Sequence, residues 1–240
     1  LNERQLVLYD KYTKILEEII SPNQSDIEKE IAIHDYLVDN INYVDTGDSS
    51  YNAYSALING IAVCSGYTEC FKTLLDMLGI ENATISGEAG GQQHIWNVVN
   101  LDNHWYHVDV TWDDPVGSSS DYIDHSYFNI SADDMALDHT WDRSRYSAYE
   151  KCGAKYSYCR YKKLPLISNV NQLNKLIYST VKNKTAHIEF TTTYNADLKE
   201  AISRTGQQLS YSYKNIDRVN YTLYSVTFIY QQKADYLNFY

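Results

Sequence analysis

The chain has 240 residues, of which 44% are hydrophobic and 21% are charged, as in an ordinary globular protein. Its formal net charge of −11 argues against binding to nucleic acid or to an anionic membrane surface, because both require clusters of basic side chains. No apolar stretch is long enough to span a membrane, so we expect no membrane-spanning segment. Tyrosine is frequent, with 24 residues against 5 phenylalanines, which favours half-buried strands.

The N-terminal part of the chain predicts two helices. It opens directly in a helical pattern without an initiating Met, and we therefore expect an upstream segment to have been removed. The first helix should cover residues 3–20 and end before Pro22. A capping box of Ser25 and Glu28 then begins the second helix. His34 lies on its apolar stripe, where we expect a packed, hydrogen-bonded structural residue.

A third helix is predicted to begin at Cys64, because apolar residues recur from there at spacings of three and four until Gly79. Cys64 would lie at the helix N-terminus, where free backbone N–H groups stabilise a thiolate. The small Ser65-Gly66 pair beside it leaves room for a substrate. Cys70 lies on the apolar stripe and should pack as a small hydrophobic residue, a role that stays open for Cys64 as well.

The remaining cysteines do not suggest a known metal or redox motif. The sequence has four, Cys64, Cys70, Cys152 and Cys159, and none forms a CxxC pair, which argues against a zinc ribbon or a thioredoxin-like site. Cys152 and Cys159 are close enough to form a small disulfide loop. Two free thiols are the alternative, and the sequence leaves both open.

A β-rich region follows the third helix. Strands are predicted over residues 82–89, 94–101 and 104–112. The stretch 87–93, rich in glycine and glutamine, is expected to be a flexible loop, whereas Asp102-Asn103 has the composition of a two-residue hairpin turn. A turn at these two residues pairs Leu101 with His104 and fixes the register of the second hairpin.

This register places polar residues on one face of the hairpin. Those residues are His94, Trp96, His107 and Asp109. His94 and Asp109 become diagonal neighbours, close enough for a side-chain hydrogen bond. A slip of one residue would destroy the relation. If the third helix packs on this face, Cys64 joins them as a nucleophile, with His94 as the general base and Asp109 as the residue that orients it.

Other arrangements of the same residues are possible. His107 is a competing base, although its place deeper in the hairpin favours a structural role. His104 lies on the opposite face and is a weaker candidate. A zinc site of His94, His107 and Asp109 would leave Cys64 unexplained. We therefore expect no metal and no organic cofactor.

The stretches AVCSGYTECFKTLLDMLGI and HIWNVVNLDNHWYHVDVTWDDP resemble the core of the transglutaminase-like superfamily, in particular its bacterial extracytoplasmic members. The resemblance covers residues 1 to about 150 and places that family's catalytic cysteine, histidine and aspartate at Cys64, His94 and Asp109. It implies an α+β, papain-like fold in which a central helix packs against an antiparallel sheet. The location it implies is extracytoplasmic, either secreted or at the cell surface.

The resemblance also implies a reaction class. A thiolate attacks a carboxamide or peptide carbonyl of a protein or peptide substrate, for instance one associated with the cell wall, and forms a thioester. An amine acceptor then gives transfer and water gives hydrolysis, as in a cysteine protease. A non-catalytic cell-surface binding protein is the third alternative. The required oxyanion hole has candidates in the backbone N–H of Cys64 or Ser65 and in the hydroxyl of Tyr51 or Tyr54.

Two tryptophans are expected near this site. Trp96 and Trp112 would form its walls, with core packing as the alternative for each. The sequence does not indicate an oligomeric state.

The C-terminal part of the chain predicts a second, smaller unit. After a linker at 164–168, the pattern is helix, strand, helix and two strands, a small α+β module without a catalytic constellation. We therefore expect a transglutaminase-like catalytic domain over residues 1–163 and a small accessory domain over residues 164–240.

Overall fold

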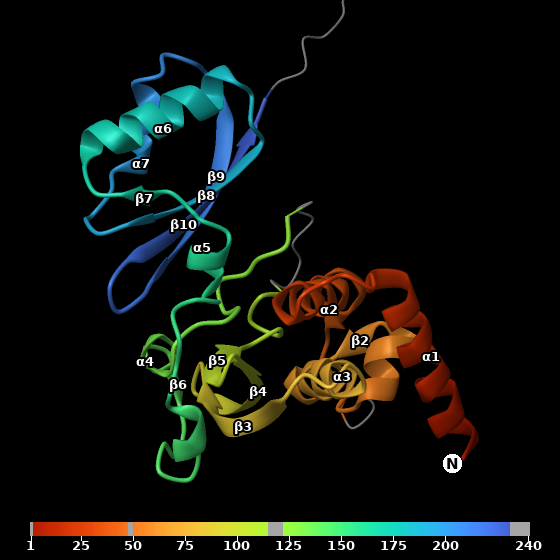
Figure 1. Ribbon diagram of the computed structural model, residues 1–240. Helices are drawn as coiled ribbons and strands as arrows, with labels where there is room; N and C mark the ends of the chain where they lie inside the picture. Colours follow the sequence, from red (N-terminus) through yellow and green to blue (C-terminus); the bar gives the residue numbers. More distant parts are fainter. Residues whose placement is uncertain (1, 48–49, 115–121, 231–240) are drawn as a thin grey trace, which may run out of the picture. The chain divides into compact units, whose positions relative to one another are not determined.

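The computed structural model describes residues 2–47, 50–114 and 122–230. It combines helices with sheets whose neighbouring strands are mostly antiparallel, which confirms the predicted α+β class. The chain divides into two compact units, Leu1–Tyr161 and Lys162–Tyr240 (Figure 1). The assignment of a catalytic and an accessory domain stays a prediction. Within the described residues, no helix is both long and apolar enough to cross a membrane.

The first unit begins with the helices expected from the sequence. Helix α1 covers Glu3–Ile19 and helix α2 covers Asp26–Asn40. The Ser25 N–H donates to Oε2 of Glu28 at 2.7 Å, as the predicted capping box requires. After a π-helix, η1 (Ser55–Asn59), comes helix α3 (Cys64–Met77), which buries its apolar face and contacts α2, β3 and β4.

A four-stranded sheet lies against α3 (Figure 1). Its strands, in spatial order, are β5 (His104–Val108), β4 (Gln92–Leu101), β3 (Asn82–Ala89) and β6 (His139–Thr140). All neighbouring strands are antiparallel. The second hairpin has the predicted register, with Leu101 opposite His104 and Val98 opposite His107. Both turn residues, Asp102 and Asn103, have positive φ values of 53° and 60°, as a type I′ turn requires.

The expectation of a flexible loop over residues 87–93 is wrong. Strand β3 runs to Ala89 and β4 starts at Gln92, so that only Gly90 and Gly91 form the turn. Their φ values are 58° and 78°, in the left-handed region that glycine adopts without strain. A tight two-residue hairpin therefore carries His94 at a fixed distance from the turn.

The short strand β6 closes the sheet at its far edge. Ala89 pairs with His139 and Glu88 pairs with Thr140. A Cβ at Gly87 would overlap the carbonyl oxygen of Thr140, so β6 can approach β3 only because residue 87 has no side chain. Three further short helices complete the unit: α4 (Ala132–Met135), η2 (Ser147–Tyr149) and α5 (Tyr158–Tyr161).

A second, two-stranded sheet precedes α3. Strand β1 (Asn42–Tyr43) pairs in parallel with β2 (Ile61–Ala62), and Tyr43 lies opposite Ala62. Because α3 begins at Cys64, two residues after β2, this pairing brings Tyr43 close to the start of the helix.

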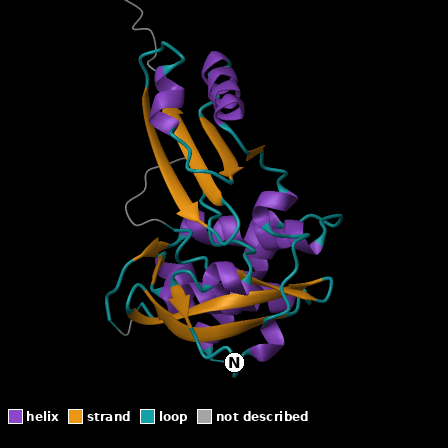
Figure 2. Cartoon of the chain, turned by 90° about the vertical axis from the view of Figure 1, so that its left-hand side faces the viewer, coloured by secondary structure: helices purple, strands orange, loops and turns teal. Residues whose placement is uncertain are grey.

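The second unit has the predicted helix–strand–helix–strand–strand order, with one strand added in front. Its elements are β7 (Leu166–Ile167), α6 (Val170–Lys182), β8 (His187–Thr192), α7 (Leu198–Ser203), β9 (Ser210–Asp217) and β10 (Thr222–Ile229). The stretch 164–168, expected as a linker, contains β7, which pairs in parallel with β8. Helices α6 and α7 cover the face of the sheet that carries Phe190 and Val226 (Figures 1 and 2).

Candidate active site

Cys64 is the first residue of α3 and is half-buried. Its residue type and place are those that a cysteine nucleophile needs, because backbone N–H groups at a helix N-terminus stabilise negative charge. Cys70 is completely buried on the apolar face of the same helix, and burial raises the pKa of its thiol. All four cysteines are free in the structure, including Cys152 and Cys159.

His94 lies between Cys64 and Asp109. Its Nε2 is 2.6 Å from Oδ2 of Asp109, which is the side-chain hydrogen bond expected from the hairpin register. The imidazole also interacts with the Cys64 thiol. Since Nε2 is engaged by the carboxylate, Nδ1 is the ring nitrogen that remains available to the thiol. The structure thus brings the three predicted residues together in the order Cys64, His94, Asp109.

Asp109 lies one residue beyond the end of β5, and strand pairing stops at Asn97 and Val108. The sequence predicts that this strand continues to residue 112. It ends earlier because Oδ1 of Asp109 accepts hydrogen bonds from the backbone N–H groups of Thr111 (3.1 Å) and Trp112 (3.2 Å), which bend the chain into a turn. The carboxylate is therefore fixed by its own turn as well as by His94.

A second histidine, which sequence reasoning missed, contacts the same carboxylate. Nε2 of His139 is 3.0 Å from Oδ2 of Asp109, and His139 is buried. It comes from β6, which the sheet places beside β3. A signal was present in the sequence, because His139-Thr140-Trp141 repeats the His-x-Trp spacing of His94-Ile95-Trp96.

The charges of these groups depend on one another. Burial opposes protonation of His94, but its hydrogen bonds with Asp109 and Cys64 outweigh burial and raise its pKa to about 10. Burial alone would raise the pKa of Asp109, yet the hydrogen bonds from His139 and His94 lower it. The site therefore favours a protonated His94 beside an ionised Asp109, which is the state that supports a neighbouring thiolate.

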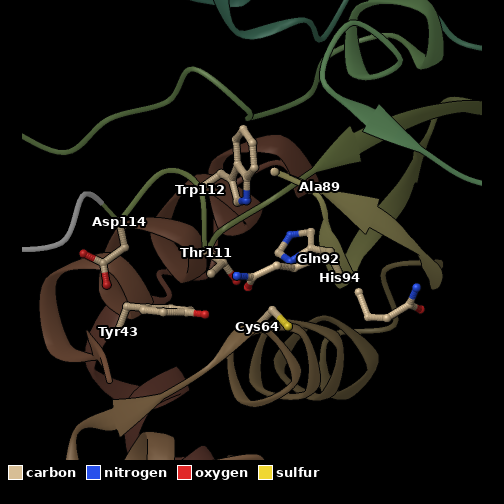
Figure 3. Close-up of a pocket in the computed structure, with 10 residues that line it drawn as sticks. Tyr43, Cys64, Ala89, Gln92, His94, Thr111, Trp112 and Asp114 are labelled. Carbon is tan, nitrogen blue, oxygen red and sulfur yellow. The ribbon is translucent and has the colours of Figure 1, made fainter. Parts of the chain in front are cut away.

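A pocket of about 330 Å³ opens at Cys64 (Figure 3). Its lining includes Tyr43, Cys64, Gln92, His94, Trp112 and Asp114. Asp114 accepts a hydrogen bond from the hydroxyl of the buried Tyr67. Cys64 and His94 thus face a cavity large enough for an amino-acid side chain.

The remaining residues predicted for the site lie at different places. The Ser65 hydroxyl donates to the backbone oxygen of Tyr51 at 3.0 Å. The Tyr51 side chain is 50% exposed and is not part of the pocket lining. Tyr54 lies under the guanidinium of Arg4, at 4.2 Å, beside a different pocket. The expectation that Tyr51 or Tyr54 reaches the site has no support in this geometry.

The aromatic side chain that does reach Cys64 is Tyr43. Figure 3 shows its phenol oxygen pointing toward the side of the pocket where Cys64 lies. Burial raises the pKa of Tyr43, and the nearby Cys64 raises it further. Tyr43 therefore keeps its proton and can donate it in a hydrogen bond.

The two tryptophans have different positions. Trp112 lines the pocket, as expected. Trp96 is completely buried and stacks on His94, with ring centroids 6.0 Å apart, so it supports the imidazole from behind and does not form a wall of the pocket. The indole N–H of Trp96 donates to Nδ1 of His107 at 3.0 Å. Burial lowers the pKa of His107 to about 3, which suits a neutral acceptor within the core.

Two clusters of side chains among the described residues have the residue types that bind metal ions. The first cluster is His94, Asp109 and His139, and the second is His34, Asp35 and His125. Within each cluster, one possible ligand atom from each residue lies within 4.8 Å of the other two. Tetrahedral zinc ligands at about 2.0 Å would lie about 3.3 Å apart. The observed separations of 2.6 and 3.0 Å in the first group, and of 3.0 and 2.7 Å in the second, are those of direct hydrogen bonds.

His34 has the structural surroundings that the sequence predicts. It is completely buried, and its ring nitrogens lie 3.0 Å from Asp35 and 3.2 Å from Asp113. Burial opposes its protonation, but the two carboxylates raise its pKa to about 9. His34 thereby joins α2 to the turn that follows Asp109.

Comparison with known proteins identifies a family over part of the chain. Residues 13–110, which include Cys64, His94 and Asp109, match the family model of the transglutaminase-like superfamily. The resemblance stated from the sequence is confirmed over this segment. A search of curated proteins gives no match.

Similar solved structures have low sequence identity. A TGase is 19% identical, with 58% of this chain and 38% of that chain covered and a TM-score of 0.43. A candidate cysteine protease from Cytophaga hutchinsonii is 17% identical, with coverages of 46% and 40% and a TM-score of 0.38. Menin, whose crystal structure reveals the binding site for the Mixed Lineage Leukemia protein, is 13% identical, with 77% of this chain and 43% of that chain covered and a TM-score of 0.40. The chain spans less than half the length of these structures.

Proposed function

We propose that this protein catalyses thiol-dependent acyl transfer on protein or peptide amides, with Cys64 as nucleophile, His94 as general acid and base, and Asp109 as the residue that orients His94. The observation that supports it best is the contact of one imidazole with both a thiol at a helix N-terminus and a buried carboxylate, 2.6 Å away, at the edge of a pocket. This is the arrangement that activates a cysteine nucleophile.

The reaction would proceed in two halves. The Cys64 thiolate attacks the carbonyl carbon of a carboxamide, a C–S bond forms, and the C–N bond breaks as His94 gives its proton to the leaving nitrogen. A primary amine then attacks the resulting thioester, loses a proton to His94, and releases the thiolate. Water in place of the amine gives the carboxylic acid, which is the hydrolase alternative.

The oxyanion of the tetrahedral intermediate needs donors near Cys64. We assign the Tyr43 hydroxyl as one donor, because Tyr43 lines the same pocket and keeps its proton. The backbone N–H groups at the start of α3 are the second source. This assignment replaces Tyr51 and Tyr54.

Incubation with a glutamine-containing peptide and a labelled primary amine tests the proposal. We expect amine incorporation with release of ammonia, detected by mass spectrometry, and its loss in Cys64→Ala. Cys152→Ala, which removes a half-buried thiol elsewhere, is the matched control and should keep activity. Cleavage or deamidation without incorporation would identify a hydrolase. If neither reaction occurs with a broad set of peptides, the protein is a binding protein and the proposal is wrong.

Location and domain roles belong to the same proposal. An extracytoplasmic location rests on the resemblance to bacterial extracytoplasmic members of the superfamily. Residues 1–163 would form the catalytic domain, since every residue assigned a role lies there, and residues 164–240 would form an accessory domain.

A further inference from the structure

We propose that His139 is a positioning residue of this site, which holds the Asp109 carboxylate beside His94 and so sets the orientation of the catalytic imidazole. The catalytic role of His139 rests on the proposed function, whereas its contacts with Asp109 do not depend on a substrate. His139 lies outside the segment matched by the family model.

One carboxylate oxygen serves both histidines. Oδ2 of Asp109 lies 2.6 Å from Nε2 of His94 and 3.0 Å from Nε2 of His139. Asp109 and His139 are each only 1% exposed, so water has little access to this oxygen. An ionised carboxylate can only accept hydrogen bonds, and therefore both imidazoles must present an N–H to it.

The other side of His139 is held in the same way. Its Nδ1 lies 2.6 Å from Oδ1 of Asp138, and Oδ2 of Asp138 accepts the Tyr127 hydroxyl at 2.5 Å. With a carboxylate at each nitrogen, the ring is clamped in one orientation. Burial opposes protonation of His139, but the hydrogen bonds to Asp109 and Asp138 raise its pKa, which favours the form in which both nitrogens donate.

The described residues place the following titratable groups around His139. They are Asp109 after β5, Asp138 before β6, His94 on β4, His107 on β5, and Tyr127 in the segment before α4. His107 has a lowered pKa and is neutral, and it has no hydrogen bond to the Asp109 carboxylate among the contacts of the described residues. Among the described residues, His139 is thus the side-chain donor that contacts the Asp109 carboxylate besides His94.

The backbone fixes His139 in this place. It pairs with Ala89 across β3 and β6, next to the hairpin turn that leads into β4 and His94. The two imidazole rings lie 5.5 Å apart between centroids. A movement of β6 would therefore change the hydrogen bonding of Asp109, and with it the position of the base relative to Cys64.

The test compares His139→Leu, which removes the donor, with His139→Gln, whose amide N–H can still donate to Asp109. We expect kcat in the amine-transfer assay to fall about 10- to 100-fold in His139→Leu, the loss that removal of such a supporting partner typically causes, with KM changed less than about threefold. At least a tenfold part of the loss should return in His139→Gln. His187→Gln, in the second unit, is the matched control.

A spectroscopic measurement needs no substrate. The proton of the His94 Nε2–H···Asp109 hydrogen bond should give a downfield NMR signal, which we expect to move in His139→Leu, because Oδ2 loses a competing donor, and to stay near its native position in His139→Gln. If His139→Leu does not fold, Asp138→Asn replaces it: the variant keeps His139 but weakens its clamp, and the same signal must move.

The outcomes separate the two proposals. A signal that moves in a protein without any transferase or hydrolase activity supports the role of His139 and contradicts the proposed function. An active protein whose signal and kcat are unchanged in folded His139→Leu, or in Asp138→Asn if that variant is needed, overturns the role of His139.

Discussion

The Nε2 atom of His94 lies 2.6 Å from the carboxylate of Asp109, which leaves Nδ1 as the ring nitrogen available to the Cys64 thiol. Asp109→Asn should abolish this fixed orientation of the His94 ring, because an amide can present either an oxygen or an N–H group to it. We expect kcat to fall by about 10²- to 10⁴-fold, as for other triads that lose their carboxylate. Steady-state kinetics on the folded variant would measure it.

Asp102→Asn is the control for this substitution. Asp102 lies in the exposed hairpin turn with φ of 53°, a conformation that Asn also adopts readily. Asp102→Asn should leave kcat within about twofold of the native value. Equal rates for Asp109→Asn and the native protein would remove Asp109 from the mechanism.

The Tyr43 hydroxyl is expected to stabilise the oxyanion. Tyr43→Phe should lower kcat by about 100-fold with little change in KM, since the lost hydrogen bond forms mainly in the transition state. Tyr51→Phe and Tyr54→Phe remove the same atom at positions outside this pocket and should have no such effect. A larger fall in kcat in either control than in Tyr43→Phe would assign the oxyanion role to Tyr51 or Tyr54.

Thiol alkylation should distinguish Cys64 from Cys70. At neutral pH and low iodoacetamide, Cys64 is expected to react first, because it opens on the pocket beside His94, whereas Cys70 is completely buried with a raised pKa. Peptide mapping by mass spectrometry would give both rates. His94→Ala should slow the reaction of Cys64 alone. Equal rates at the two cysteines would contradict activation of Cys64.

Glu30 should make stability depend on pH. Burial raises its pKa to about 8, although Oε2 accepts a hydrogen bond from Asn129 at 3.0 Å. A glutamate in the unfolded chain releases its proton near pH 4.3, so between about pH 4.3 and 8 the folded state keeps a proton that the unfolded state has lost. The free energy of unfolding therefore decreases as pH rises, by at most about 1.4 kcal/mol per pH unit for this group.

Glu30→Gln removes this dependence and keeps an oxygen for Asn129. The variant should gain stability over the native protein at pH 8 and lose most of that gain at pH 5, as measured by urea unfolding. Glu18→Gln, at an exposed position of α1, serves as the control. A gain that is the same at both pH values would show that Glu30 does not titrate in this range.

Gly87 is expected to be essential for the attachment of β6. Gly87→Ala would place a methyl group against the carbonyl oxygen of Thr140 and displace the strand that carries His139. We expect lower thermal stability together with a fall in kcat. Ser86→Ala, at the neighbouring exposed position, changes no Cβ and should preserve both. Native activity in Gly87→Ala would mean that β6 can move without disturbing Asp109.

The parts of the site that could be predicted depend on local rules. The helix start at Cys64 follows from apolar periodicity, and the His94–Asp109 contact follows from a two-residue turn that fixes the register of one hairpin. Tyr43 and His139 come from strands β1 and β6, which are two residues long. Such strands have no periodicity of their own, and their partners are chosen by tertiary packing, which a single sequence does not display.

Element length also determines which parts of the fold can be predicted from the sequence. Helices α1, α2 and α3 and the second unit could be predicted because each contains enough residues for a hydrophobic pattern to repeat. The sequence predicts a linker where β7 lies, because a strand of two residues is too short for a hydrophobic pattern to repeat. It predicts a flexible loop around Gly90-Gly91, because small and polar residues occur both in loops and beside tight turns. The neighbouring backbone, rather than composition, determines which of the two forms.

Trp112 joins substrate contact to acid–base chemistry. Its side chain forms part of the pocket, while its backbone N–H holds Oδ1 of Asp109. A bound molecule that displaces the indole must also disturb the carboxylate that orients His94. In the proposed reaction, a substrate that fits poorly would therefore be converted slowly after it has bound, so that selectivity would appear in turnover more than in affinity.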